Sequence, residues 1–183
     1  MNLSIPRTNV SPSQRRALLA SPSGWIATGL GSGFAPFAPG TFGSLAALVP
    51  YLALRHAPGW ALALAIVALF ALGVRAADAV EAMLERKDPG LIVVDEWVGQ
   101  WLTLTLMEAM AGRFPDTFGT PLLWHVLLIG FLAFRLCDIV KPWPASLADR
   151  RVPGGLGTML DDVAAALWAA LLGAGLLAAL ALV

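Results

Sequence analysis

Five carboxylates stand beside long apolar stretches of the sequence: Asp95, Glu96, Asp138, Asp161 and Asp162. An ionisable side chain at membrane depth costs about 2.5–3.5 kcal/mol on insertion scales, so it usually marks a functional site or a buried pair. Carboxylates that gather without histidine or cysteine favour a hard divalent cation, and Mg²⁺ is the usual choice for phosphate substrates. The pattern therefore predicts that these five acids supply Mg²⁺ ligands and the general base, without dividing those roles.

Basic residues accompany the acids. Arg135 and Asp138 are three residues apart, which places them on one helix face, and Lys141 and Arg150 follow. Guanidinium and ammonium groups bind phosphate oxygens through charge-assisted hydrogen bonds. We predict that Arg135, Lys141 and Arg150 bind a phosphomonoester. An Arg135–Asp138 pair that only satisfies itself is the alternative interpretation.

A glycine-rich segment, residues 29–44, precedes the first apolar run. Thr41 and Ser44 within it can cap a helix whose N-terminus favours anions, so both are predicted to complete the phosphate pocket. A plain loop is the alternative. By the same logic, Asp95 and Glu96 could serve only as favourable charges at a helix N-terminus.

Several other phosphatase chemistries are excluded. His56 and His125 are expected at the ends of apolar runs away from the acids, which removes a histidine nucleophile. Cys137 is not followed by a Cys-x5-Arg loop, and no Gly-x4-Gly-Lys-Ser/Thr nucleotide loop occurs. What remains is hydrolysis by a metal-activated water, or attack by a carboxylate, with Arg and Lys holding phosphate oxygens.

The elements that must position these residues are membrane helices. The chain is 58% hydrophobic and 13% charged, with a mean hydropathy of +0.74, whereas soluble domains are about 45–50% apolar and about 25% charged. A net charge of zero argues against a nucleic-acid partner. We predict an all-α polytopic membrane bundle of about five spans, the first short or re-entrant. The apolar runs are 40–54, 59–80, 91–111, 121–140 and 163–183.

The basic residues predict an orientation. All of the twelve except Arg55 and Arg113 fall at connections that would share one side of the membrane. The positive-inside rule then predicts a cytoplasmic N-terminus, a periplasmic C-terminus and the acids at the cytoplasmic face. Residues 1–24 are interpreted as a flexible cytoplasmic tail, and residues 25–183 as a single membrane-embedded phosphatase domain.

These motifs together resemble the phosphatidylglycerophosphatase A family of bacterial membrane lipid phosphatases. The resemblance covers residues about 25 to 165, in the order and spacing of the family. One departure follows the last motif, where this chain has Ala164-Ala165 instead of Ala-Gly. The matching segments are Gly31-Ser32-Gly33, 38–45, Asp95-Glu96 with Gly99 and Trp101, Phe134-Arg135 with Asp138, 141–144, Asp149-Arg150, 154–157, and Met159 with Asp161-Asp162.

The resemblance implies a Mg²⁺-dependent phosphatase that removes the terminal phosphate of phosphatidylglycerophosphate, giving phosphatidylglycerol and inorganic phosphate. It also implies a phospholipid substrate and residence in the inner membrane, with chemistry on the cytoplasmic side. Two other classes stay open: a small transporter with a carboxylate ion site, and a non-catalytic subunit whose charges form interface salt bridges. The sequence does not set the number of metal ions, the substrate range or the oligomeric state.

Overall fold

In the computed structural model, which describes residues 10–118 and 122–182, those residues form helices and connections without a strand. The helices have lengths from one turn to 28 residues. They are α1 (Pro12–Leu19), α2 (Pro22–Ala27), the 3-10 helix η1 (Ser32–Phe34), α3 (Pro39–Leu54), α4 (Gly59–Leu84), α5 (Val94–Arg113), α6 (Pro115–Phe118), α7 (Leu123–Val140), α8 (Ala145–Arg151) and α9 (Gly154–Ala181).

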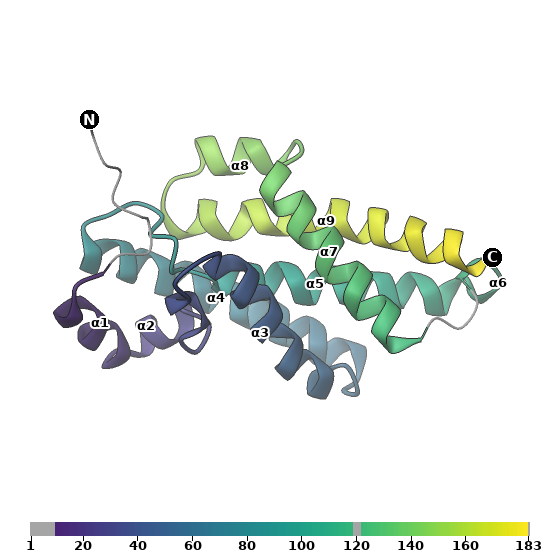
Figure 1. Ribbon diagram of the computed structural model, residues 1–183, viewed down its shortest axis with the longest axis horizontal. Helices are drawn as coiled ribbons and strands as arrows, with labels where there is room; N and C mark the ends of the chain where they lie inside the picture. The colour runs from purple at the N-terminus through teal and green to yellow at the C-terminus, as the bar shows by residue number, and fades with distance from the viewer. Residues whose placement is uncertain (1–9, 119–121, 183) are drawn as a thin grey trace.

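The long helices form an elongated bundle around α5 and α9 (Figure 1). Helix α9 packs against α5, α7, α4 and the short α8, while α3 packs along α5 and also contacts α7. Helices α1 and α2 lie beside α4, near the end of the bundle that carries α8. Helix α6 and the C-terminus lie at the other end (Figure 1).

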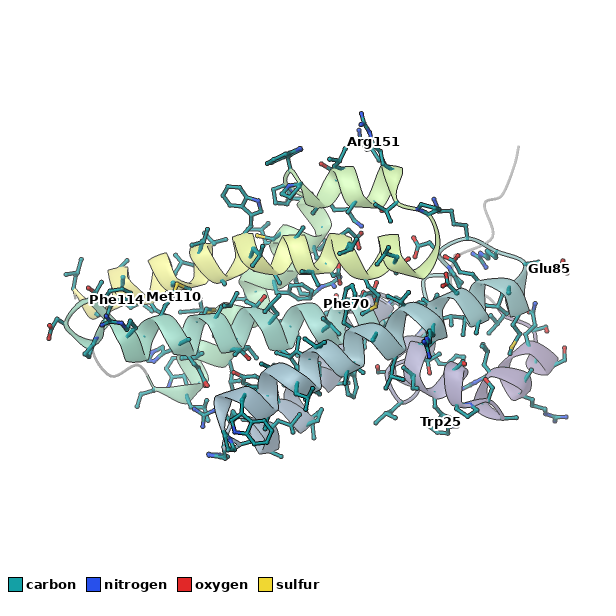
Figure 2. All side chains as sticks on the ribbon, turned by 180° about the vertical axis from the view of Figure 1, so that it is seen from behind. Trp25, Phe70, Glu85, Met110, Phe114 and Arg151 are labelled. Atoms are coloured by element: carbon teal, nitrogen blue, oxygen red, sulfur yellow. The ribbon has the colours of Figure 1, made fainter. Side chains whose placement is uncertain are left out.

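Small residues explain the close packing of α9. Its buried face carries Ala165, Ala166, Ala169, Ala170 and Gly173. Membrane helices associate through such residues because they let two backbones approach closely. The opposite face of α9 exposes large leucines, as do the outer faces of α4 and α7, and Figure 2 shows side chains projecting along the whole length of the bundle. An apolar outer surface of this extent indicates contact with lipid rather than water.

Among the described residues, three helices are long and apolar enough to cross a membrane: α4, α7 and α9. The expected number of about five spans is not confirmed. Helix α3 is apolar but has only 16 residues. Helix α5 has 20 residues but carries two acids in its first turn, Glu108 near its end and Arg113 in its last turn. Because α5 packs against α3, α4, α7 and α9, it needs less apolar surface than a helix that faces lipid.

The two ends of the bundle differ in composition. We call the polar end the one formed by the first turns of α3, α5 and α9, the last turns of α4 and α7, and α8. Helix α9 begins at Gly154, nine residues before the apolar run predicted from Val163. Asp161 and Asp162 are therefore inside a helix and not in the connection before it. The predicted limits Pro121 and Val183 lie outside the described residues.

The described part of the predicted tail contains α1 and the start of α2. Ser11 caps α1, where its side chain accepts a hydrogen bond from the Gln14 backbone N–H and the Gln14 side chain accepts one from the Ser11 N–H. Leu18 at the end of α1 is fully buried. Residues 1–9 lie outside the described residues. The division into a tail and a membrane domain stays a prediction.

Candidate active site

The first turn of α5 places Asp95 and Glu96 at the polar end. The segment before it is fixed because the Val93 N–H donates to the Ala27 carbonyl at 2.8 Å, and α5 begins at the next residue, Val94. Asp95 is 9% exposed. No side chain caps this helix, and the N–H groups of its first turn create a positive electrostatic potential. This potential favours the negative charge of the two carboxylates.

Helix α9 brings Asp162 to the same place. One carboxylate oxygen each from Asp95, Glu96 and Asp162 lie within 4.8 Å of one another. We call these three residues the carboxylate triad. Asp95 Oδ1, Glu96 Oε2 and Asp162 Oδ2 are buried and have no hydrogen-bond partner among the residues that the structure describes. Three like charges at this separation repel one another strongly unless a cation or protons compensate them.

The other two predicted acids are paired with cations. Asp138 Oδ2 forms an ion pair with Arg135 Nη1 at 2.6 Å, and the two residues are one helical turn apart on α7. Asp161 is in contact with the Lys141 ammonium, and its Oδ1 also accepts the Asp162 backbone N–H at 3.0 Å. The five acids thus divide into two that each have a close cation and three that do not, although Glu96 Oε1 lies 3.6 Å from the Arg135 Nη1 that Asp138 holds more closely.

Lys141 ties three segments together. It follows α7 in a left-handed conformation, with φ of 48°, and its ammonium reaches both Asp161 of α9 and Asp149 of α8, the latter at 3.1 Å. Burial alone lowers the pKa of Lys141, but the hydrogen bond and negative charge of Asp161 outweigh this and raise the pKa above its usual value. The lysine therefore stays charged, and its ties stay intact, throughout the neutral and mildly alkaline range.

Two close helix approaches depend on glycine. A Cβ on Gly40 would lie 2.1 Å from Glu96 Oε1 and 3.1 Å from both terminal nitrogens of Arg135. A Cβ on Gly99 would lie 2.4 Å from Phe134 Cε2. The first glycine lets the start of α3 approach the ionic groups, and the second lets α5 approach α7.

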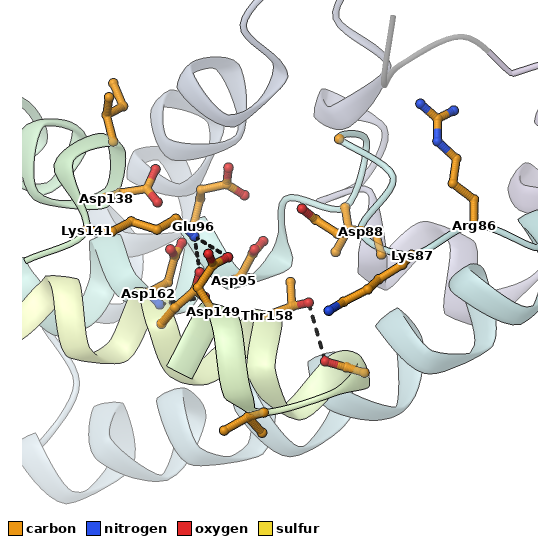
Figure 3. Close-up of a pocket in the computed structure, with 16 residues that line it drawn as sticks. Arg86, Lys87, Asp88, Asp95, Glu96, Asp138, Lys141, Asp149, Thr158 and Asp162 are labelled. Atoms are coloured by element: carbon orange, nitrogen blue, oxygen red, sulfur yellow. Dashed lines mark hydrogen bonds and ion pairs between the residues drawn. The ribbon is translucent and has the colours of Figure 1, made fainter. Parts of the chain in front are cut away.

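The acids line a polar cavity of about 580 Å³ at this end of the bundle (Figure 3). Its wall includes seven carboxylates but only three basic residues, so it favours a cation or an anion that arrives with one. The lining residues are Arg86, Lys87, Asp88, Gly90, Ile92, Asp95, Glu96, Asp138, Ile139, Lys141, Asp149, Val152, Gly154, Thr158, Asp161 and Asp162.

All five predicted acids line this cavity, whereas of the predicted phosphate ligands only Lys141 does. Arg135 lies behind the wall, paired with Asp138 and 3.6 Å from Glu96 Oε1. Ser44 lies behind Arg135, accepting its Nη1 at 3.5 Å and donating to the Gly40 carbonyl at 2.9 Å. Thr41 is half-buried and Arg150 is exposed, and neither lines the cavity.

Sequence reasoning missed part of the wall. Arg86, Lys87 and Asp88 come from the connection between α4 and α5, and Asp149 and Thr158 from α8 and α9. The signal for the first group was the Arg86-Lys87 pair, which had been used only to orient the chain. Asp149 was part of a motif but was not assigned to the site.

Comparison with known proteins identifies relatives. A family model described as phosphatidylglycerophosphatase A matches residues 25–177. Two relatives carry that name: one from Escherichia coli is 33% identical over 82% of this chain and 80% of the relative, and one from Haemophilus influenzae is 34% identical over 88% and 92%. A Bacteroides thetaiotaomicron protein, named as a candidate phosphatidylinositol-3-phosphatase, is 38% identical over 80% and 88%. No solved structure matches.

Proposed function

Because the chain belongs to the phosphatidylglycerophosphatase A family and is therefore a phosphatase, we propose that it hydrolyses phosphatidylglycerophosphate to phosphatidylglycerol and inorganic phosphate in phospholipid synthesis, using Mg²⁺. The observation that carries the proposal is the carboxylate triad: Asp95, Glu96 and Asp162 all line the polar cavity, and each has a buried oxygen without a partner among the described residues. The site is thus open to a charged headgroup, while its helices can hold the lipid tails in the bilayer.

The triad fits Mg²⁺. Its donors are all carboxylate oxygens, the ligands that this hard cation prefers, and several are buried without a protein donor. Asp95, Glu96 and Asp162 would hold the ion. When bound, Mg²⁺ would act as a Lewis acid on the phosphoryl group and offset its developing negative charge.

The remaining residues bind and orient the reactants. Lys141 lines the cavity, stays protonated and can bind a phosphate oxygen. Its ion pairs also keep Asp161 and Asp149 in place. Arg135 positions Asp138 and Glu96 from behind the wall. A carboxylate of the site that is not occupied by the cation accepts the proton of the attacking water and returns it to the alcohol oxygen of the lipid as the bond between phosphorus and that oxygen breaks. The predicted contacts of Thr41, Ser44 and Arg150 with substrate stay predictions.

The geometry favours an enzyme over an ion-coupled transporter. Transporter sites lie near the bilayer midplane, often on broken helices. Here α5 and α9 are continuous, and the acids lie at one end of the bundle. Arg86, Lys87, Lys141, Arg150 and Arg151 share that end, whereas Arg55 and Arg113 lie at the other. This asymmetry supports an inner-membrane protein with its active site on the cytoplasmic face.

The test is phosphate release by the purified protein in detergent, with Mg²⁺ and with EDTA. The lipids are phosphatidylglycerophosphate, phosphatidate and phosphatidylinositol 3-phosphate; the last is included because of the name of the Bacteroides relative. We expect Mg²⁺-dependent release from phosphatidylglycerophosphate that exceeds release from the other two. No release from any lipid, or release that EDTA leaves unchanged, would contradict the proposal.

A further inference from the structure

The cavity has a wall that the proposed reaction does not yet use, formed by residues 85–93 between α4 and α5. Hydrogen bonds fix this connection at both ends. Glu81 of α4 accepts the Arg86 N–H with its carbonyl at 3.1 Å and the Asp88 N–H with its carboxylate at 2.7 Å. At the far end, the Val93 N–H bonds the Ala27 carbonyl. The side chains of this connection are therefore carried by a fixed backbone.

Lys87 is the basic residue of this wall whose side chain points toward the acids. In Figure 3 its ammonium extends toward the acids from the side opposite to Lys141, whereas the Arg86 side chain points away from them. The Lys141 ammonium is held by Asp149 and Asp161. Within the described part of the chain, no carboxylate holds the Lys87 ammonium in this way, so its donors remain available to a ligand.

The proposed substrate has two phosphates of different kinds: a terminal phosphomonoester and a phosphodiester that joins the headgroup to the lipid. The phosphomonoester belongs at the triad, where bond cleavage takes place. The phosphodiester is also an anion, and the seven carboxylates of the wall repel it. It needs a cation away from the triad, within the same cavity.

Resting on the proposed function, we propose that Lys87 binds the phosphodiester of the substrate and so selects lipid headgroups that carry a second phosphate beside the one removed. Lysine suits this role because a diester offers a single delocalised charge to a point-charge donor. Lys87 is a binding residue and takes no part in bond cleavage. Loss of its charge should weaken binding of any ligand with the diester and leave the cleavage step unchanged.

The experiment compares the wild type with Lys87→Gln, Lys87→Arg and Arg151→Gln. Arg151 is exposed at the end of α8, points outward in Figure 2 and does not line the cavity, so it controls for loss of one surface charge at the same end. The measurements are KM and kcat for phosphatidylglycerophosphate, and the inhibition constants of phosphatidylglycerol and inorganic phosphate. The first inhibitor carries only the diester, and the second mimics only the released group.

Lys87→Gln should raise KM and the inhibition constant of phosphatidylglycerol about tenfold, the size of one charge-assisted hydrogen bond (about 1.4 kcal/mol). It should leave kcat and the inhibition constant of phosphate within twofold. Lys87→Arg and Arg151→Gln should resemble the wild type. If Lys87→Gln left KM unchanged, or weakened the binding of both inhibitors equally, the proposed role of Lys87 would be overturned, while the proposed function would stand. A wild type without activity would instead refute the proposed function, and this inference with it.

Discussion

The two ends of the bundle treat charge differently. At the end away from the site, Arg55 meets Glu108 of α5, with Nε at 3.0 Å and Nη2 at 2.9 Å from the same carboxylate oxygen. One cation and one carboxylate satisfy each other there. At the polar end, Arg135 and Lys141 hold Asp138 and Asp161, yet Asp95, Glu96 and Asp162 remain without a dedicated cation.

This difference distinguishes charged residues that support the fold from charged residues that serve a binding site. A bundle that needs only stability can pair each carboxylate or omit it, because an uncompensated buried charge is costly. An excess of buried acids at one site must be compensated by bound protons or by a cationic ligand. The polar end is therefore interpreted as a binding site and the Arg55–Glu108 pair as a support of the fold.

The largest expected effect comes from Asp162→Asn or Asp95→Asn. Each keeps the shape of the side chain but removes a charge from the triad, so phosphate release should fall by about 10³-fold or more, as expected when a preorganised electrostatic contact is lost. Membrane insertion and yield should stay at wild-type levels. Full activity in both variants would exclude the triad as the metal site.

Removal of divalent cations should also change stability. The Mg²⁺-loaded protein should melt at a higher temperature than the protein in EDTA, by an amount equivalent to about 2.7 kcal/mol when the ion is at 100 times its Kd. In Asp162→Asn the difference should shrink, because the ion loses a ligand and the metal-free site loses a repelling charge. Thermal denaturation in detergent measures both proteins. Equal melting temperatures with and without Mg²⁺ in the wild type would count against a resident ion.

Gly40→Ala should have an intermediate effect. Its methyl group would lie 2.1 Å from Glu96 Oε1, so α3 or the carboxylate must move, and we expect activity to fall roughly tenfold. Gly112→Ala is the matched control, because a Cβ there meets nothing within 4 Å. Comparable activity of the two variants would show that the approach of α3 does not position Glu96.

The smallest effect on activity should follow Glu108→Gln. This change leaves Arg55 without its ion pair at the end remote from the site, and both side chains are 25% exposed. Stability should fall by roughly 1 kcal/mol, while kcat/KM stays within twofold. The melting temperature and the phosphate-release assay give the two readouts. A large loss of activity would mean that the two ends are coupled.

The sequence predicted which acids gather but not how they divide. Charges beside apolar runs are conspicuous in a sequence, so five of the seven acids that line the cavity were identified, and only Asp88 and Asp149 were not. The spacing of Arg135 and Asp138 also indicated their contact. It could not show that Arg135 lies behind the cavity wall, since that depends on how closely α3 and α5 approach α7. Lys87 was missed because a basic residue in a connection has the same pattern whether it faces solvent or a cavity.

The all-helical class could also be predicted from the sequence, whereas the number of membrane spans could not. Hydropathy reports how apolar a helix is, not whether lipid or protein surrounds it. Helix α5 illustrates this limit, because its polar residues lie within a shell of other helices. The predicted apolar run from Val163 lies within α9, but hydropathy did not show that the helix begins earlier, because Gly154 to Asp162 is a polar, glycine-rich segment that still belongs to it.

Helix α9 is continuous from Asp162, a proposed metal ligand, through its apolar part, so the proposed site and the bilayer should be mechanically connected. The part of the helix from Val163 to Ala181 rises about 28 Å at 1.5 Å per residue, close to the roughly 30 Å of a hydrocarbon core. With this part of α9 as a membrane span, we expect Asp162 at the level of the lipid headgroups, on the same helix that would anchor the protein. A thicker or thinner membrane would tilt or shift this helix, so the acyl-chain length of the host lipids should tune how well the aspartate meets its substrate.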